Sequence, residues 1–305
     1  MLTALIQMSL LIACGSLWKY YAPSHISPLA HRRALTDIVF YIFLPAMVLN
    51  VIWDAPLNQS SLFISFLAAC GVLSGLLVTW FILKGLNCSN EQRGVLLLAS
   101  SFPNATYLGL PVLEQVIGPS ARATVLQYDL FACTPILLSV GMLIARYYGD
   151  NKTDVHPIKE LVKVAPLWAV ALGVTFNLGG LEQPSFIHNG LSTLSGAVVP
   201  LMLIVLGMSI QWKSIHIRFI SLLLPIIATS LIIVPLVVLG LSHSIGLEII
   251  LINQVVIVAA MPTMIFGIVI SERYHLDTEL YAAAVTVTTL FSLITLPVWF
   301  YFLSR

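Results

Sequence analysis

The sequence predicts an all-α integral membrane protein of ten transmembrane helices, built as two inverted five-helix repeats. Its composition, the placement of its basic residues and a set of recurring motifs lead to this prediction. Of the 305 residues, 59% are hydrophobic and only 9% are charged, whereas a soluble domain carries about 25% charged residues. A chain with so few charges must turn most of its surface toward the lipid bilayer. Its net charge of +1 argues against nucleic acid as a partner.

Ten apolar segments are long enough to cross a bilayer, for which a helix needs about 20 residues. In the first half they cover residues 2–21, 34–53, 61–83, 94–117 and 123–147, and in the second half residues 161–178, 187–210, 219–241, 247–270 and 280–303. No basic residue precedes the first segment and no small-residue cleavage site follows it, so it is predicted to be a span and not a signal peptide. The polar stretch 149–160 divides the chain into predicted repeats of residues 1–150 and 151–305.

The Lys and Arg residues of the connecting loops give the orientation, because cytoplasmic loops carry an excess of positive charge. With the N-terminus outside, all but two of the 14 Lys and Arg residues fall on the inner side. The two exceptions are Arg122 and Arg305. We therefore expect both termini outside, in a multi-pass protein of the plasma membrane, which is the inner membrane of a bacterium.

Three motifs of the first half recur in the second half in the same order. Their offsets are nearly constant, at 155, 159 and 160 residues. Since five spans is an odd number, the second copy must lie upside down, and inverted repeats of this kind are typical of secondary transporters. Chance is the alternative, because proline and apolar pairs are common in membrane helices. The matched pairs are Leu44-Pro45 with Val199-Pro200, Phe102-Pro103 with Met261-Pro262, and Leu130-Phe131 with Leu290-Phe291.

The fourth segment carries two prolines, a glycine and several polar side chains in its centre. Proline removes a backbone donor and clashes with the preceding turn, and in lipid the freed carbonyl groups need other partners. We predict a broken helix that lines a cavity, with Pro262 and Thr263 marking a matching break in the ninth segment. The alternative is a pair of kinked helices that only adjust their packing. The candidate substrate-binding residues of the fourth segment are Pro103, Asn104, Thr106, Tyr107 and Pro111.

An anionic substrate would meet no cationic side chain, because no Lys or Arg lies in the middle of any predicted span. It would depend on Asn104, on nearby hydroxyl groups and on the N-terminal ends of the half-helices, which favour an anion. Asn50 on the second segment is a further candidate that would face the cavity from the opposite side. A hydrogen bond between helices is an equal alternative for its amide.

Asp129 is the one carboxylate placed well inside a predicted span. At the centre of a membrane a carboxylate costs about 2.5–3.5 kcal/mol, so such a residue usually faces a cavity or a partner. With its neighbour Gln127 it is predicted to bind the coupling ion, a proton or sodium. The alternatives are a structural hydrogen bond or a tether to Arg122.

The motifs of other functional classes are absent from the sequence. It has no phosphate-binding loop of the GxxxxGK[ST] type and no HExxH or GxSxG motif, so neither an ATP-driven pump nor a membrane hydrolase is expected. The four cysteines have no partners at metal-binding spacing, and we expect no metal or cofactor. The sequence thus predicts that the chain is not an enzyme.

The pattern Pro103-Asn104-x-x-Tyr107-x-Gly109-x-Pro111, the later Ala260-Met261-Pro262 and the five-plus-five layout resemble the auxin efflux carrier family, in its bacterial PIN-like form. The resemblance covers the whole chain. It implies that the fourth and ninth helices cross at their prolines. Spans 1, 2, 6 and 7 would then form a scaffold, and spans 3–5 and 8–10 would form a transport unit that moves as an elevator. The resemblance also implies small organic anions as substrates, either auxin or dicarboxylates such as malate or malonate.

One position of this chain departs from the family pattern. This chain has Thr263, and not a second Asn, after the second proline, so a symmetric pair of amide ligands is not expected. Family members are often dimers, and a homodimer is therefore expected.

Besides an efflux carrier, the sequence leaves open a membrane receptor that binds the ligand without moving it, and a channel. The charged rings of a channel pore are not visible in the sequence.

Overall fold

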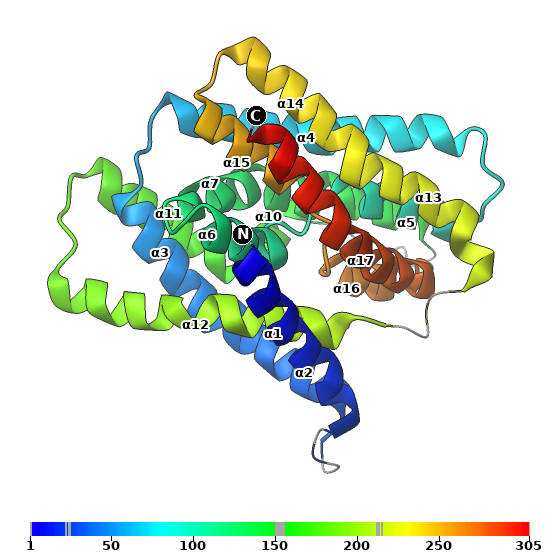
Figure 1. Ribbon diagram of the computed structural model, residues 1–305, viewed down its shortest axis with the longest axis horizontal. Coiled ribbons are helices and arrows are strands. Elements are labelled where there is room, and N and C mark those ends of the chain that lie inside the picture. The colour runs from blue at the N-terminus through cyan, green and yellow to red at the C-terminus, as the bar shows by residue number, and fades with distance from the viewer. Residues whose placement is uncertain are drawn as a thin grey trace.

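The computed structural model describes residues 2–21, 23, 26–149, 156–211, 214 and 216–304. These residues fold into helices joined by short loops, and no β-strand occurs among them (Figure 1). In the first half the helices are α1 (Leu2–Tyr21), α2 (Pro28–Ile38), α3 (Leu44–Asp54), α4 (Gln59–Leu83), α5 (Asn90–Ser101), α6 (Leu110–Val116), α7 (Ala121–Tyr128), α8 (Thr134–Ile136) and α9 (Met142–Tyr148). In the second half they are α10 (Pro157–Val162), α11 (Ala165–Leu178), α12 (Ser185–Ser209), α13 (Ile220–Ala228), α14 (Val234–Ile245), α15 (Ile249–Ala259), α16 (Gly267–Tyr274) and α17 (Thr278–Leu303).

Wider π-helical turns join several of these helices into longer rods. They are η1 (Val39–Phe43), η2 (Ala105–Gly109), η3 (Asp129–Cys133), η4 (Leu137–Gly141) and η7 (Thr229–Ile233), and a short 3₁₀ turn, η6 (Ile217–Phe219), precedes α13. Four of the π turns end two residues before a proline, and these prolines are Pro45, Pro111, Pro135 and Pro235. A proline lacks an N–H group and its ring clashes with the carbonyl one turn back. A π turn widens the helix at that point and gives the ring room, so these prolines do not end the rods.

Six helical stretches are long and apolar enough to cross a membrane, judged by length and composition. They are Pro28–Asp54, Gln59–Leu83, Ala121–Tyr148, Ser185–Ser209, Ile220–Ile245 and Thr278–Leu303. Each coincides with one of the ten predicted spans. The predicted first span is α1, and the sixth corresponds to the shorter apolar helix α11. The predicted fourth span corresponds to α5, η2 and α6, and the ninth to α15 and α16. The described part of the chain is therefore all-helical, with several helices that could cross a membrane.

Glycines bring two pairs of helices into close contact. α1 packs against α12, where a Cβ atom added to Gly15 or to Gly207 would lie only 2.0 Å from a backbone oxygen of the facing helix. α3 packs against α11, where a Cβ atom on Gly173 would lie 3.1 Å from the side chain of Ile52. Small residues at such contacts let membrane helices approach closely. In Figure 1, α1, α2, α3 and α12 gather in the lower part of the molecule.

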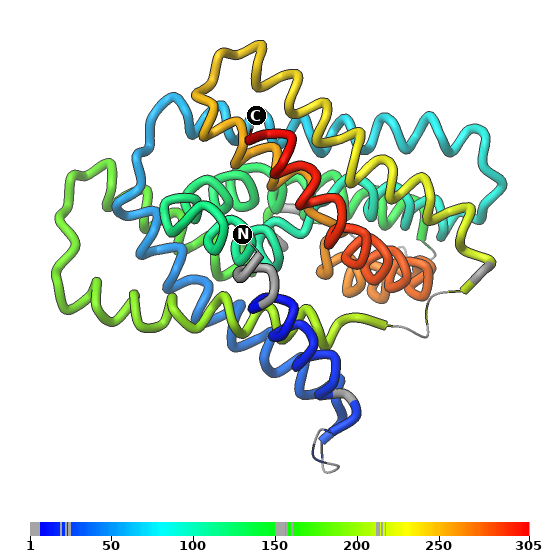
Figure 2. The backbone as a smooth tube through the Cα atoms, in the orientation of Figure 1, coloured from blue at the N-terminus to red at the C-terminus, as the bar shows by residue number. Residues whose placement is uncertain are grey.

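The remaining long helices form a second group. α4 packs against α5 and α14, and α13 packs against α17. Figure 2 shows α4 (cyan) and the α13–α14 rod (yellow) running side by side through the upper part of the molecule. Shorter helices fill the middle, and there the chain between α5 and η2 meets the chain between α15 and α16. This meeting point positions most of the candidate site residues.

Candidate functional site

Two irregular segments, one from each half of the chain, lie side by side in the protein interior. α5 ends at Ser101 and α15 ends at Ala259, and several residues follow each end before the next helical turn begins. The N–H of Asn104 donates to the carbonyl oxygen of Pro262 at 2.7 Å, and the N–H of Met264 donates to the carbonyl oxygen of Phe102 at 3.0 Å. Backbone groups that a continuous helix would have paired internally thus find partners across the junction, as a buried chain requires.

Thr263 is held on both sides of this junction. It faces Pro103 in an isolated antiparallel bridge and is fully buried. Its hydroxyl donates to the carbonyl oxygen of Ala99 at 2.7 Å, and its N–H donates to the hydroxyl oxygen of Thr288 at 3.1 Å. The hydroxyl predicted to contact substrate therefore already has a protein partner. Thr288 on α17 was not singled out in the sequence, because its role depends on a contact between distant segments.

The side chain of Asn104 is in a different situation. The residue is 3% exposed, and its carbonyl oxygen accepts from the N–H groups of Leu108 and Gly109 at 3.2 and 3.0 Å, which begins the turn η2. Its side-chain nitrogen Nδ2 is buried and has no hydrogen-bond partner among the described residues. A buried donor without a partner costs about 1–3 kcal/mol, so a ligand or water usually satisfies it. The side-chain amide of Asn104 is therefore a donor without a partner among the described residues at this junction.

Asp129 opens the π turn η3 and is 5% exposed. The hydroxyl of Thr106 donates to one of its carboxylate oxygens, and the hydroxyl of Thr134 donates to the other at 3.0 Å. Thr106 lies two residues after Asn104, so the carboxylate ties η3 directly to the junction. A tether from Asp129 to Arg122 is not formed, because the guanidinium of Arg122 pairs with the carboxylate of Glu114 on α6.

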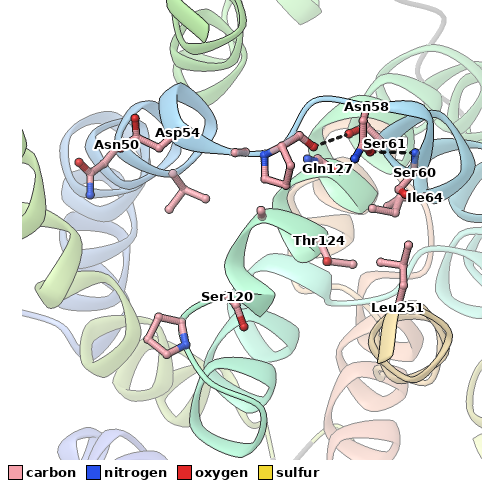
Figure 3. Close-up of a pocket in the computed structure, with 15 residues that line it drawn as sticks. Asn50, Asp54, Asn58, Ser60, Ser61, Ile64, Ser120, Thr124, Gln127 and Leu251 are labelled. Atoms are coloured by element: carbon pink, nitrogen blue, oxygen red, sulfur yellow. Dashed lines mark hydrogen bonds between the residues drawn. The ribbon is translucent and has the colours of Figure 1, made fainter. Parts of the chain in front are cut away.

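A cavity of about 410 Å³ lies where α3, the beginning of α4, α7 and α15 face one another (Figure 3). Asn50 and Gln127, both predicted site residues, line it. The amide oxygen of Asn50 accepts from Nε2 of Gln183 at 3.1 Å, so the interhelical hydrogen bond weighed for this residue is present. Asp54 and Thr124 also line the cavity, and sequence reasoning did not single out either of them. Neither Asn104 nor Asp129 is among the lining residues.

The other predicted residues lie at the junction or beside it. Pro103 and Pro262 are buried within the two irregular segments. Tyr107 is partly buried in η2, and Pro111 is buried at the second position of α6. Within the described part of the chain, no group of three or more His, Cys, Asp or Glu side chains could hold a metal ion.

The arrangement therefore has three parts. At the junction, the amide of Asn104 is an unpaired donor. Beside it, the carboxylate of Asp129 is buried among hydroxyl groups. The cavity lined by Asn50 and Gln127 is a separate hollow. Together they offer an uncharged donor, a buried carboxylate and a cavity of about 410 Å³, which suits binding of small polar or charged solutes.

Comparison with known proteins finds one matching family and several relatives that match most of the chain. The chain matches the family described as "Membrane transport protein" over residues 1–162 and over residues 154–300. It is 29% identical over 269 residues to an "Uncharacterized transporter" of Methanothermobacter thermautotrophicus, with 87% of each chain covered. It is 28% identical over 280 residues to a second such transporter, from Methanocaldococcus jannaschii, with 88% of this chain and 89% of the relative covered. The "Uncharacterized transporter YfdV" of Escherichia coli is 21% identical over 283 residues, with 88% of each chain covered.

Proposed function

Because this chain belongs to the membrane transport protein family, the family of the auxin efflux carriers, we propose that it is a secondary transporter that exports small organic anions. The membership confirms the resemblance seen in the sequence. The family and its relatives are transporters and not enzymes, so the expectation that this chain is not an enzyme is confirmed. The observation that carries the proposal is the buried, unpaired amide nitrogen of Asn104 at the junction of two irregular segments.

The proposed architecture has ten spans in two inverted repeats, residues 1–150 and 151–305, with both termini outside the plasma membrane. Helix packing supports it, because α1 packs on α12 and α3 packs on α11. These are the pairs of spans one with seven and two with six, which an inversion exchanges. Helix length supports it too. With 12 residues, α5 reaches about 18 Å, and with 11 residues, α15 reaches about 16 Å, of a hydrocarbon layer roughly 30 Å thick. Each would need the helix after the irregular segment to complete a span.

The proposed substrates are dicarboxylates such as malate or malonate, or auxin-like carboxylates. Their carboxylates would accept hydrogen bonds from Nδ2 of Asn104. Thr106, Tyr107 and the backbone around Pro103, Pro111 and Pro262 would shape the surroundings. Thr263 would hold the junction together, since its hydroxyl is already bonded to Ala99. Asn50, which lines the cavity and not the junction, would contact the substrate only as it passes through the cavity.

Asp129 would carry the coupling ion, a proton or sodium, with Gln127 nearby. The connection to substrate runs through Thr106, which donates to Asp129 and lies two residues from Asn104. When a proton or cation neutralises the carboxylate, it becomes a weaker acceptor for the Thr106 hydroxyl. The turn η2 can then shift, and the amide of Asn104 shifts with it. Ion binding and substrate binding would be linked by this short chain of contacts.

The junction would move as part of a transport unit formed by spans 3–5 and 8–10, against a scaffold of spans 1, 2, 6 and 7. The hydrogen bonds that hold the junction support this division. The partners of its backbone and of Thr263 come from α5, α17 and the irregular segments themselves, and Tyr281 on α17 also donates its hydroxyl to the carbonyl oxygen of Met264 at 3.2 Å. All of them belong to the proposed transport unit, so an elevator movement would carry the junction without breaking these bonds.

A counterflow experiment on purified protein in liposomes separates this proposal from its two rivals. Vesicles are loaded with unlabelled malonate, diluted into labelled malonate, and followed over time. A carrier exchanges the two pools, so labelled malonate transiently accumulates inside above its outside concentration. A channel lets the pools equilibrate without an overshoot, and a receptor takes up no label beyond what it binds. The same assay repeated with malate, succinate and indole-3-acetate identifies the preferred anion.

A further inference from the structure

The cavity of Figure 3 contains one charged side chain among the 15 residues that line it. This is Asp54, the last residue of α3, which is exposed and has no hydrogen-bond or ion-pair partner among the described residues. The remaining polar residues of the lining are amides and hydroxyls, such as Asn50, Gln127 and Thr124. No Lys, Arg or His lines the cavity. The charge facing this space is therefore negative.

Arg122 is the basic residue nearest in the sequence to the residues that line the cavity, and it does not offset the charge of Asp54. Arg122 follows the lining residue Ser120 closely on the chain, but its guanidinium contacts the carboxylate of Glu114 through two nitrogens. This pair is mostly buried, with side-chain exposures of 20% and 18%. Its two charges cancel, and the carboxylate of Asp54 is left as the group that sets the sign of the potential in the cavity.

We propose that this cavity is a cation-selective vestibule, with Asp54 as the residue that determines its selectivity. The inference rests on the proposed function, in which the loops beside the cavity lie on the extracellular side of the membrane. A cleft with low-dielectric walls concentrates the field of the charges that line it. The vestibule would thus admit the coupling cation from outside and repel an organic anion from the same side. In the proposed orientation the opposite face carries most of the Lys and Arg residues and would attract that anion, which favours export.

The size of the effect follows from Coulomb's law. At low salt and about 10 Å in water, a single negative charge lowers the local concentration of a monoanion by about twofold and of a dianion by about fourfold. Charge at the mouth of a site acts mainly on the rate of association. At 1 M salt, where the Debye length is about 3 Å, the effect should vanish.

Charged thiol reagents measure this potential directly, without any transport. Ser120, at the edge of the cavity in Figure 3, is replaced by cysteine, and the same protein without that substitution serves as the blank for the native cysteines. The reaction rates of a cationic and an anionic methanethiosulfonate are then compared at low salt. We expect the ratio of cationic to anionic rate to fall at least twofold when Asp54→Asn is added. Glu272→Gln, which removes a charge from an exposed residue of α16 outside the lining, should leave the ratio unchanged.

An unchanged ratio in the Asp54→Asn protein overturns the inference. A second measurement uses the KM of transport for the anion supplied from outside. At low salt only, Asp54→Asn should lower this KM about fourfold for a dianion and about twofold for a monoanion. The two failures can be told apart. If the unmodified protein transports no anion, the proposed function is wrong. The ratio of the reagent rates still determines the sign of the electrostatic potential in the vestibule. If transport occurs but the ratio does not respond to Asp54, only the vestibule falls.

Discussion

Asn104 donates its backbone N–H to the carbonyl oxygen of Pro262 at 2.7 Å, and this bond joins the two halves of the chain in the protein interior. The same residue leaves its side-chain nitrogen buried without a partner among the described residues. Its main chain thus holds the junction while its side chain remains available. The separation allows the two roles to be tested independently, because a side-chain substitution leaves the backbone bond in place.

Replacing Asn104 by Ala should abolish most of the affinity for the substrate anion without unfolding the protein. A hydrogen bond to a charged group contributes about 1.5–3 kcal/mol, so binding should weaken about 10- to 150-fold. The measurement is the concentration dependence of anion uptake, at matched protein levels in liposomes. Asn189→Ala is the control, since Asn189 is an exposed amide on α12. Equal uptake curves for Asn104→Ala and the unmodified protein would remove Asn104 from the site.

Asp129→Asn keeps the shape of the side chain but removes its negative charge. If this carboxylate binds the coupling ion, anion transport should lose its dependence on the proton or sodium gradient. Uptake is measured with each gradient imposed separately, in the variant and in the unmodified protein. Glu182→Gln, at an exposed position, controls for a simple loss of charge. Unaltered gradient dependence in Asp129→Asn would make this residue structural, held by Thr106 and Thr134 alone.

Pro262→Ala should slow transport more than Pro235→Ala. An alanine at position 262 regains an N–H group and lets α15 continue past Ala259, which would disturb the bond from Asn104. Pro235 lies at the beginning of α14, just after a π turn within a continuous rod, so the helix there already accommodates it. Initial rates of anion exchange give the comparison. Similar losses at the two positions would argue against a special role for the junction.

Thr288→Val should destabilise the folded protein by about 1–3 kcal/mol, because it leaves the buried N–H of Thr263 without its acceptor. Valine has nearly the same size, so little else changes. Thermal unfolding in detergent measures the effect as a lower Tm. Thr193→Val is the matched control, since Thr193 is exposed on α12 and its hydroxyl bonds only within its own helix. If both variants unfold at the same temperature, the contact between α17 and the junction contributes little.

The long helices could be predicted from the sequence because lipid constrains both their length and their composition. The predicted span 61–83 differs from α4 (Gln59–Leu83) by two residues, and the predicted span 280–303 differs from α17 (Thr278–Leu303) by two. The π turns before the prolines were not predicted. A proline is read in the sequence as a break or a kink, and only the structure shows that a widened turn accommodates it.

The candidate site was less accessible to sequence reasoning. The prolines and polar residues of the fourth segment led to the predicted break, since each is unfavourable in an ordinary membrane helix. The partner residues could not be found in the same way. Thr288, Thr134 and Asp54 are ordinary in their local sequence, and their contacts depend on how distant helices pack. Thr263 was predicted to contact substrate, but in the folded chain its hydroxyl donates a hydrogen bond to the carbonyl oxygen of Ala99.

Gradient-driven uptake by the purified protein in liposomes tests the central claim most directly. Labelled malonate, malate, succinate and indole-3-acetate are supplied in turn, with a proton gradient, a sodium gradient or neither. Our account predicts that one of these anions accumulates saturably above its equilibrium level, that a single gradient drives this accumulation, and that Asn104→Ala prevents it. Uptake that only equilibrates, or that is as strong in Asn104→Ala as in the unmodified protein, would contradict the account.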